Sequence, residues 1–383
     1  MSSSSSAAPT LRETAEAVAA DAFSLLEPLV NCTSVSGDVH GYERCVALVE
    51  EMLPREAHSE RIACSTASCA PDLLVRLTGT GSGRIVLLGH LDTVIPAERH
   101  RPLRQQSGRW TGSGTFDMKG GDALAVGLLR ALATQPERFA EVALLLVADE
   151  EWRVAEFAHG PRFDGWDACL CFEGGERTED GDEGVVVRRK AAASIEVVAH
   201  GRSAHAGSRP DDGRNALLAL ATVAHQLAAL HDPSGPGALS VVPTIIHCGE
   251  AVNVVPADGQ LTCDLRADEI AVIERALDRV PPEIDGVMLD ASFGRRWPGM
   301  DHRDRALPVL ERAGATLGRP IVGRSRGGAS DASHLAPWVD VAIDGLGPLG
   351  GGAHAEDEHI DGTTLADRAA VAVAIAHAVL DAA

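Results

Sequence analysis

Short apolar runs alternate with helical patterns up to about residue 188. Four runs are apolar enough to be buried strands, at residues 73–77, 85–88, 142–147 and 168–172. Apolar side chains at helical spacing indicate helices at residues 12–29 and 41–54, and another between the second and third runs that contains Ala123, Val126, Leu128, Leu129 and Leu132. Strands that alternate with helices indicate an α/β fold, with a mainly parallel sheet that is flanked by helices and covered on both faces.

The pattern changes near residue 188 to that of a smaller unit. Residues 193–198 form a half-exposed strand pattern. The segments that follow predict a helix, two strands, a helix and a strand, at residues 214–230, 239–247, 259–266, 268–280 and 286–292. This order fits a small α+β insert with an antiparallel sheet. Beyond Trp297 the α/β pattern returns, with a helix at 304–317, a strand at 339–343 and a closing helix from 364.

The sequence therefore predicts two domains, one of them discontinuous. A chain of 383 residues exceeds the usual size of a single core. The α/β domain is expected over residues 11–188 and 298–383, and the inserted domain over residues 189–297. Residues 1–10, which are rich in serine, are expected to be a disordered tail.

Composition excludes several kinds of partner. The formal charge of -21 argues against nucleic acids and anionic membranes, since both require a basic protein surface. No apolar run approaches the ~20 residues that cross a bilayer, and the N-terminus lacks the pattern of a secretory signal. The eight cysteines contain no Cys-x-x-Cys pair, which favours reduced thiols. We expect a soluble, cytoplasmic protein.

Glu150 and Glu151 form an adjacent acidic pair directly after the apolar run at 142–147. The exit of a buried strand is where open α/β sheets place their chemistry. Neighbouring carboxylates repel each other unless a cation or protons relieve them, so the pair indicates a metal site or an acid/base with a shifted pKa. The alternative is a solvated acidic turn.

His90, Asp92 and Asp117 extend this pattern. In an extended segment residues two apart face the same way, so Asp92 can hold one imidazole nitrogen of His90 while the other binds a metal. A structural hydrogen bond is the alternative. Asp117 lies in a glycine-rich turn just before a helix, where it could instead cap that helix. The glycine spacing matches neither phosphate-binding fingerprint.

Glu173 follows another buried strand, and His354 lies in the glycine-rich segment 350–358. Each of these residues alone could be an ordinary loop residue. Their recurrence at the strand ends of one α/β framework favours a single metal site.

With these motifs the chain resembles the co-catalytic di-zinc amidohydrolases, a family that includes glutamate carboxypeptidase, acetylornithine deacetylase, succinyl-diaminopimelate desuccinylase and the aminoacylases. The resemblance covers residues 40–380. It implies that Glu150 is the general base and that Asp92 orients a ligand histidine. It also implies two zinc ions per chain, for which Co²⁺ or Mn²⁺ can substitute. The implied ligands are His90, Asp117 as the bridge between the metals, Glu151, Glu173 and His354.

The resemblance extends to the predicted insert. The segment 201–207 resembles a lid whose histidine, here His205, enters the active site of the partner subunit and stabilises the tetrahedral intermediate. This implies a homodimer through the inserted domain. Asn253 and Arg266 match substrate-binding positions, and an arginine fork suits a substrate carboxylate. Gly327 and Gly328 match a glycine-rich loop that lines the substrate.

Two segments depart from the family pattern. The family usually continues to Gly-Ser soon after the Glu-Glu pair, whereas this chain reads Trp152-Arg153-Val154. This segment borders the substrate pocket, so the departure bears on specificity more than on chemistry. Ala191 stands where a glycine is common after the basic pair 189–190.

The predicted function is zinc-dependent hydrolysis of an amide bond in a peptide or N-acyl amino acid that bears a free carboxylate, as in glutamate carboxypeptidase. The first alternative is an N-acyl amino acid deacylase of the acetylornithine deacetylase type. A non-catalytic metal-binding or peptide-binding protein would not need the base Glu150. An aminopeptidase would need a site for a free amine rather than the carboxylate clamp that Arg266 indicates.

Overall fold

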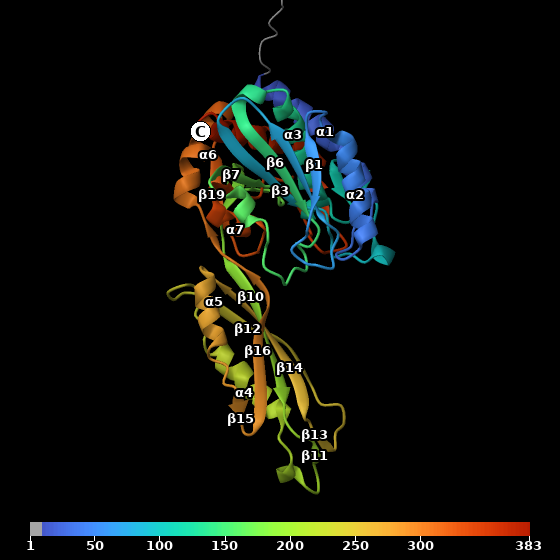
Figure 1. Cartoon of the computed structure of the whole chain (residues 1–383), viewed down its shortest axis with the longest axis vertical. Helices are drawn as coiled ribbons and strands as arrows, with labels where there is room; N and C mark the ends of the chain where they lie inside the picture. The colour runs from blue at the N-terminus through green and yellow to red at the C-terminus, as the bar shows by residue number, and fades with distance from the viewer. Residues whose placement is uncertain (1–9) are drawn as a thin grey trace, which may run out of the picture. The chain divides into compact units, whose positions relative to one another are not determined.

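The computed structural model describes residues 10–383, which form two compact units (Figure 1). The first unit contains the chain up to Arg188, Asp301–Ser325 and Ser330–Ala383. The second contains Arg189–Met300 and the short segment Arg326–Ala329, whereas the sequence-based limits of the insert were 189–297. Of the predicted tail, residues 1–9 lie outside the described range. Thr10 is described, and it caps the first helix together with Glu13.

A six-stranded sheet forms the centre of the first unit. Its order is β1 (His58–Ile62), β2 (Asp72–Thr78), β6 (Phe139–Val147), β3 (Gly83–His90), β7 (Trp166–Cys171) and β19 (Val339–Ile343). The strands β6, β3, β7 and β19 run parallel, while at one edge β2 pairs antiparallel with β6 and β1 pairs antiparallel with β2. The predicted mainly parallel sheet is confirmed, and its strands are the four apolar runs with β1 and β19 at the edges.

Helices cover mainly one face of this sheet. They are α1 (Leu11–Asn31), α2 (Val39–Met52), α3 (Gly120–Ala133), α6 (Arg303–Leu317) and α8 (Leu365–Leu380). Their apolar residues share one core with alternate strand residues such as Leu87, Leu144 and Leu170. Figure 1 shows α1, α2 and α3 together beside the sheet.

The opposite face of the sheet is covered with few helices. Cys171, next to Leu170 on β7, contacts Ser330 just before the short helix α7 (Ala332–Leu335). The remaining cover comes from 3-10 turns and from irregular chain after β6. Glycines and a proline at 160, 161 and 165 interrupt that chain, which explains why no long helix forms there.

Two small sheets complete the first unit. One joins β20 (Gly350–Gly351), β21 (His359–Asp361), β5 (Arg109–Thr111) and β4 (Arg104–Gln106), and the other joins β17 (Met300–Asp301), β9 (Glu183–Arg189), β18 (Ile321–Arg326) and β8 (Glu176–Arg177). The first sheet pairs β21 with β5, so the segment that contains His354 lies beside the turn that contains Asp117.

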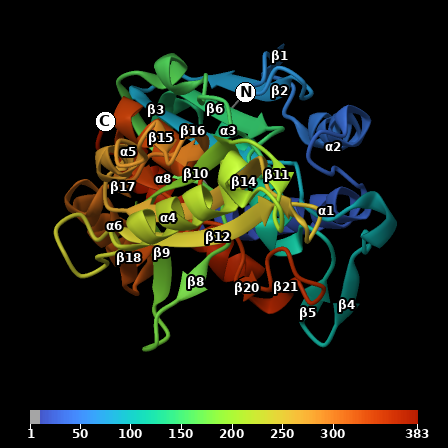
Figure 2. The same ribbon diagram turned by 90° about the horizontal axis from the view of Figure 1, so that it is seen from below.

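The second unit has a five-stranded antiparallel sheet, as the sequence predicts. Its order is β12 (Ser240–Cys248), β14 (Asp258–Ala267), β10 (Ala191–His200), β16 (Val287–Trp297) and β15 (Glu283–Ile284). The helices α4 (Ala216–Ala228) and α5 (Ile270–Leu277) run along one face (Figures 1 and 2). They pack on alternate β10 residues such as Ile195 and Val197. A separate two-stranded sheet joins β11 (Ala204–His205) to β13 (Val254–Val255).

One described helix is long and apolar enough to cross a membrane by length and composition. It spans Gly362–Leu380, and 72% of its apolar 18-residue window is buried inside the fold. The expectation that no apolar run approaches this length is therefore wrong for this segment. The alanine-rich helix α8 is apolar because it packs between α1 and α6 in the core.

Candidate metal centre

The carboxyl ends of three neighbouring parallel strands carry the predicted chemistry. His90 is the last residue of β3, Glu150 and Glu151 follow β6, and Glu173 follows β7. Because parallel strands end at the same edge of a sheet, these side chains meet there.

His90 is fully buried, and its two ring nitrogens face different groups. Nδ1 lies 3.0 Å from the main-chain oxygen of Asp92 and 3.4 Å from its Oδ1. Nε2 lies 3.1 Å from Oδ1 of Asp117. The structure thus places Asp92 on one side of the imidazole and leaves Nε2 facing the site, which is the arrangement of a ligand histidine with an orienting carboxylate.

Asp92 also accepts backbone hydrogen bonds that were not predicted from the sequence. Its Oδ1 accepts the backbone N–H of Glu150 at 3.2 Å, and its Oδ2 accepts that of Glu151 at 3.2 Å. The hydroxyl of Ser36 also donates to Oδ2, at 2.8 Å. Asp92 therefore fixes the turn of the Glu-Glu pair as well as the imidazole.

Asp117 faces two histidines, one with each carboxylate oxygen. Oδ1 lies 3.1 Å from Nε2 of His90, and Oδ2 lies 3.1 Å from Nε2 of His354. Asp117 does not cap α3, because the cap position is held by Lys119 without a side-chain hydrogen bond. This removes the capping alternative for Asp117.

Glu358 holds the turn that presents Asp117. Its carboxylate accepts three backbone N–H groups, from Gly114 at 2.8 Å, Phe116 at 2.9 Å and Asp117 at 3.0 Å. It also lies four positions after His354, so one buried side chain ties together the two segments that supply Asp117 and His354. No role was predicted for Glu358, and its only signal in the sequence is its position close to His354.

The five candidate ligands fall into two groups that share Asp117. In the first, Oε1 of Glu173 lies 3.8 Å from Nε2 of His90. In the second, Oε1 of Glu151 lies 3.0 Å from Nε2 of His354. Each group contains one histidine, one carboxylate of its own and one oxygen of Asp117. The structure thus brings all five predicted ligands together.

This concentration of charge shifts the pKa values of the group. Burial raises the pKa of Glu150, Glu151 and Glu173 above the usual range of a glutamate. Hydrogen bonds to Asp117 and Glu151 raise the pKa of His354 to about 10. Burial opposes a charged His90, but hydrogen bonds with Asp117 and Asp92 outweigh it and raise its pKa. The protons that these groups hold would be displaced by cations.

The donor set fits a pair of divalent cations. Two imidazole nitrogens and three carboxylates offer nitrogen and oxygen donors without sulfur, which suits zinc and also cobalt or manganese. The carboxylates carry enough negative charge to neutralise most of the charge of two such ions. One group of ligands is present for each ion, and the carboxylate of Asp117 has one oxygen in each group.

The segment after the Glu-Glu pair has a defined structure of its own. Trp152 and Val154 are 40% and 63% exposed, whereas Arg153 between them is buried. Its guanidinium is ion-paired with Asp331 and lies 4.9 Å from the ring centre of Phe157. The pairing of Arg153 with Asp331 was not predicted, and it anchors this departure from the family pattern in the fold.

His205 and Asn253 lie in the second unit. The backbone N–H groups of Gly207 and Ser208 donate to Nδ1 of His205 at 3.1 and 3.2 Å. A neutral ring that accepts at Nδ1 carries its proton on Nε2, so His205 presents an N–H donor. The main-chain oxygen of Asn253 accepts the N–H of Ala206 at 2.9 Å, which joins the two predicted segments.

Arg266 and the glycine pair also lie together in the second unit. The arginine fork is paired with Asp264 through Nε at 3.1 Å and Nη2 at 3.0 Å. Its Nη1 lies 3.5 Å from the carbonyl oxygen of Gly327. The next carbonyl, of Gly328, accepts a hydrogen bond from Arg189 at 2.9 Å. Arg266 thus lies against the glycine-rich loop, with part of its fork already occupied by Asp264.

Comparisons with solved structures agree with this fold. Aminopeptidase PepT from Bacillus cereus ATCC 10987 has a TM-score of 0.74 at 20% identity, over 94% of this chain and 98% of that chain. An M20 family metallo-carboxypeptidase from Sulfolobus solfataricus has a TM-score of 0.68 at 15% identity, over 94% of this chain and 98% of that chain.

Comparisons of sequence identify the family. Carboxypeptidase G2 of Pseudomonas sp. (strain RS-16) is 27% identical over 365 residues, which are 88% of this chain and 84% of that protein. Succinyl-diaminopimelate desuccinylase of Xylella fastidiosa (strain M23) is 31% identical over 310 residues, which are 74% of this chain and 80% of that protein. Residues 86–378 match the model of peptidase family M20/M25/M40. The chain therefore belongs to the M20/M25/M40 family of peptidases, which agrees with the resemblance seen in its motifs.

Proposed function

We propose that this metal-dependent hydrolase uses two zinc ions to cleave an amide bond next to a free carboxylate. The observation that carries the two-metal arrangement is the position of Asp117, whose two oxygens face two different histidines at 3.1 Å each. When bound, two divalent cations supply Lewis acidity, which polarises a carbonyl and lowers the pKa of a water from 15.7 to roughly 7.

The chain's own residues supply the remaining steps. Glu150 takes the proton of the attacking water and returns it to the leaving amine. Burial raises its pKa, as a group that both accepts and donates a proton near neutrality requires. Asp92 holds the backbone of Glu150 in place. His205, with its proton on Nε2, is the donor that stabilises the developing oxyanion.

The names of two relatives suggest two possible reactions. A carboxypeptidase releases a carboxyl-terminal residue, and a desuccinylase removes a succinyl group from an amine. Both names are compatible with hydrolysis of an amide bond in a substrate that carries a carboxylate. We favour the carboxypeptidase reaction, with N-acyl amino acid deacylation as the alternative. Parallel assays with carboxyl-terminal dipeptides and N-acyl amino acids, each as free acid and as amide, distinguish the two reactions.

Arg266→Ala is expected to raise KM for free-acid substrates by about 10- to 150-fold, because it removes a charge-assisted pair worth roughly 1.5 to 3 kcal/mol. The parent enzyme should turn over the amidated counterpart poorly. Arg296→Ala is the matched control, since Arg296 is also paired with an acid, Glu274, in the same unit. If the parent enzyme cleaves acid and amide equally well, Arg266 does not bind the substrate carboxylate.

We also propose a homodimer formed through the second unit. β12 is an edge strand, and its Val242, Ile245 and Ile246 are exposed. An edge strand with exposed apolar residues is a ready surface for pairing with another strand. Pairing with β12 of a second copy of the chain would cover these apolar residues and extend the sheet across a two-fold axis.

In such a dimer, Glu150→Gln and His205→Ala should each be nearly inactive alone but should complement each other when mixed. A heterodimer contains one doubly defective site and one intact site, so random exchange predicts about a quarter of parental activity. Differently tagged chains, captured through one tag and detected through the other, verify the exchange. If exchange is complete and activity stays at the level of the single variants, His205 does not act across the interface.

A further inference from the structure

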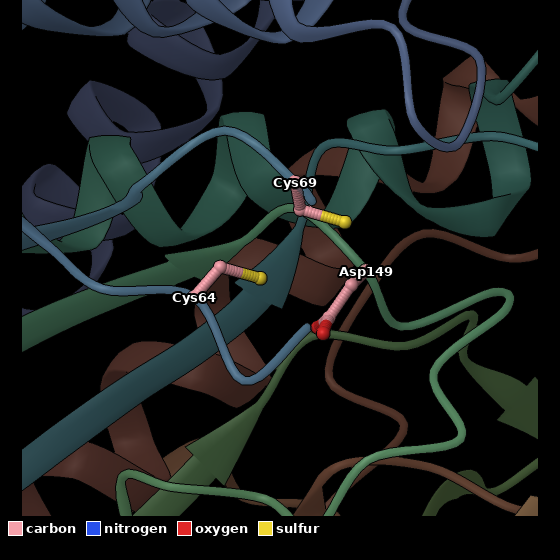
Figure 3. A group of neighbouring side chains, drawn as sticks. All are labelled: Cys64, Cys69 and Asp149. Carbon is pink, nitrogen blue, oxygen red and sulfur yellow. The ribbon is translucent and has the colours of Figure 1, made fainter. Parts of the chain in front are cut away.

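A second cluster of potential metal ligands lies next to the Glu-Glu pair. Cys64 and Cys69 lie in the loop between β1 and β2, and Asp149 lies one residue before Glu150. One ligand atom from each of the three residues lies within 4.8 Å of the other two. In Figure 3 the Cys64 sulfur and the Asp149 carboxylate point toward a common space, with Cys69 at its edge.

Two buried polar atoms at this cluster have no hydrogen-bond partner among the described residues. Asp149 is completely buried, and its Oδ1 accepts no hydrogen bond within the described residues, although Nη1 of Arg153 lies 3.5 Å away. Oγ1 of Thr66, between the two cysteines, is also buried without a hydrogen-bond partner in the described part of the chain. The N–H of Thr66 donates to the other oxygen of Asp149 at 2.9 Å, which holds the cysteine loop over the carboxylate.

We propose that Cys64, Cys69 and Asp149 bind a third metal ion, a thiophilic divalent cation such as Zn²⁺ or Cd²⁺, at a site separate from the dinuclear centre. Two sulfurs and one carboxylate oxygen suit these ions and do not suit Mg²⁺ or Ca²⁺, which require oxygen ligands throughout. The cation gives Oδ1 of Asp149 a direct ligand bond in addition to its 3.5 Å ion pair with Arg153. Binding links the cysteine loop to the turn that carries the general base.

The competing use of the two cysteines is a disulfide. All eight cysteines of the chain are free thiols in the structure. Burial and the neighbouring carboxylates raise the pKa of the Cys64 thiol, and burial raises the pKa of Cys69 to about 11. Both are therefore neutral thiols that give up their protons to solvent when a cation binds. A disulfide would leave Oδ1 of Asp149 with only its 3.5 Å ion pair with Arg153, whereas a cation would bind this oxygen directly.

Cadmium titration of the reduced, metal-free full-length protein tests the site, because thiolate–cadmium bonds absorb in the ultraviolet. The parent protein should develop this absorption, and Cys64→Ser and Cys69→Ser should each abolish it. Cys248→Ser, which removes a thiol of the second unit, and His354→Ala, which removes a ligand of the dinuclear centre, should both retain it. The readout is independent of hydrolysis, so it stands apart from the proposed function.

A second measurement needs no variant. With Cd²⁺ at ten times its dissociation constant only about a tenth of the sites stay open, so alkylation of Cys64 and Cys69 by iodoacetamide should slow by about tenfold. Cys248 in the same sample is the internal control, and peptide mapping reads all three thiols. Undiminished alkylation of Cys64 and Cys69 at saturating cadmium overturns the site. So does cadmium absorption that is equal in the parent and in both serine variants.

Discussion

Replacing Glu150 with glutamine is expected to lower kcat by about 10²- to 10⁴-fold, the usual contribution of a positioned general base. The substitution keeps the shape of the side chain and removes its ability to take a proton from water. The backbone N–H that Asp92 accepts is unchanged, so the turn of the Glu-Glu pair should stay in place. Metal analysis of the purified variant should therefore show the same metal content as the parent enzyme.

Glu151→Gln is the matched control for this substitution, because it makes the same chemical change one residue away. Glu151 is 3.0 Å from His354 and belongs to one of the two ligand groups, so its loss should weaken metal binding. The metal content of the two variants thus shows which glutamate is the general base and which is a metal ligand. If Glu150→Gln loses metal and Glu151→Gln keeps it, the two roles are exchanged.

Removal of metal by a chelator should abolish hydrolysis, and added Zn²⁺ should restore it. Two histidines and three carboxylates otherwise surround a site with no Lewis acid to polarise the substrate carbonyl. Activity and metal content should be measured on the same samples throughout the titration. Unchanged activity in protein shown to be free of metal contradicts a metal-dependent reaction.

The chelation experiment has an internal control in the cysteine cluster. Cys64→Ser lacks a proposed ligand of the third site but keeps the dinuclear centre. Its activity should fall on chelation and recover with zinc in the same way as that of the parent enzyme. Different zinc requirements for recovery would show that the third ion contributes to activity.

Much of the fold followed from local patterns in the sequence. Buried strands such as β3 and β6 are continuous apolar runs, and helices such as α6 have clear apolar periodicity. The sheet of β20, β21, β5 and β4 was not predicted, because strands of two or three residues are too short to show a period. The sheet that contains β9 and β18 was not predicted either, although these two strands are longer. The sparse helical cover of one face was also missed, since loops and 3-10 turns pack there without a repeating pattern.

The site could be predicted where a chemical residue follows a strand, as with His90 and Glu173. The contacts that hold these site residues in place could not be predicted from the sequence. Glu358 binds the N–H of Asp117 from 241 positions away, and Arg153 pairs with Asp331 across 178 positions. Contacts of this kind depend on how the loops pack in three dimensions. A local sequence pattern contains no information on which distant loops will meet.

The hydrogen bonds of Glu358 bear on the thermodynamics of metal uptake. Flexible ligand loops would lose conformational entropy when an ion orders them, and this loss would weaken the observed affinity. Here three backbone N–H groups are already bound to one buried carboxylate, so the turn at Asp117 is ordered by the protein itself. Little of the intrinsic binding free energy is then consumed in ordering this turn. Preorganisation of Asp117 would thus favour tight retention of the metal ions that this residue is proposed to bind.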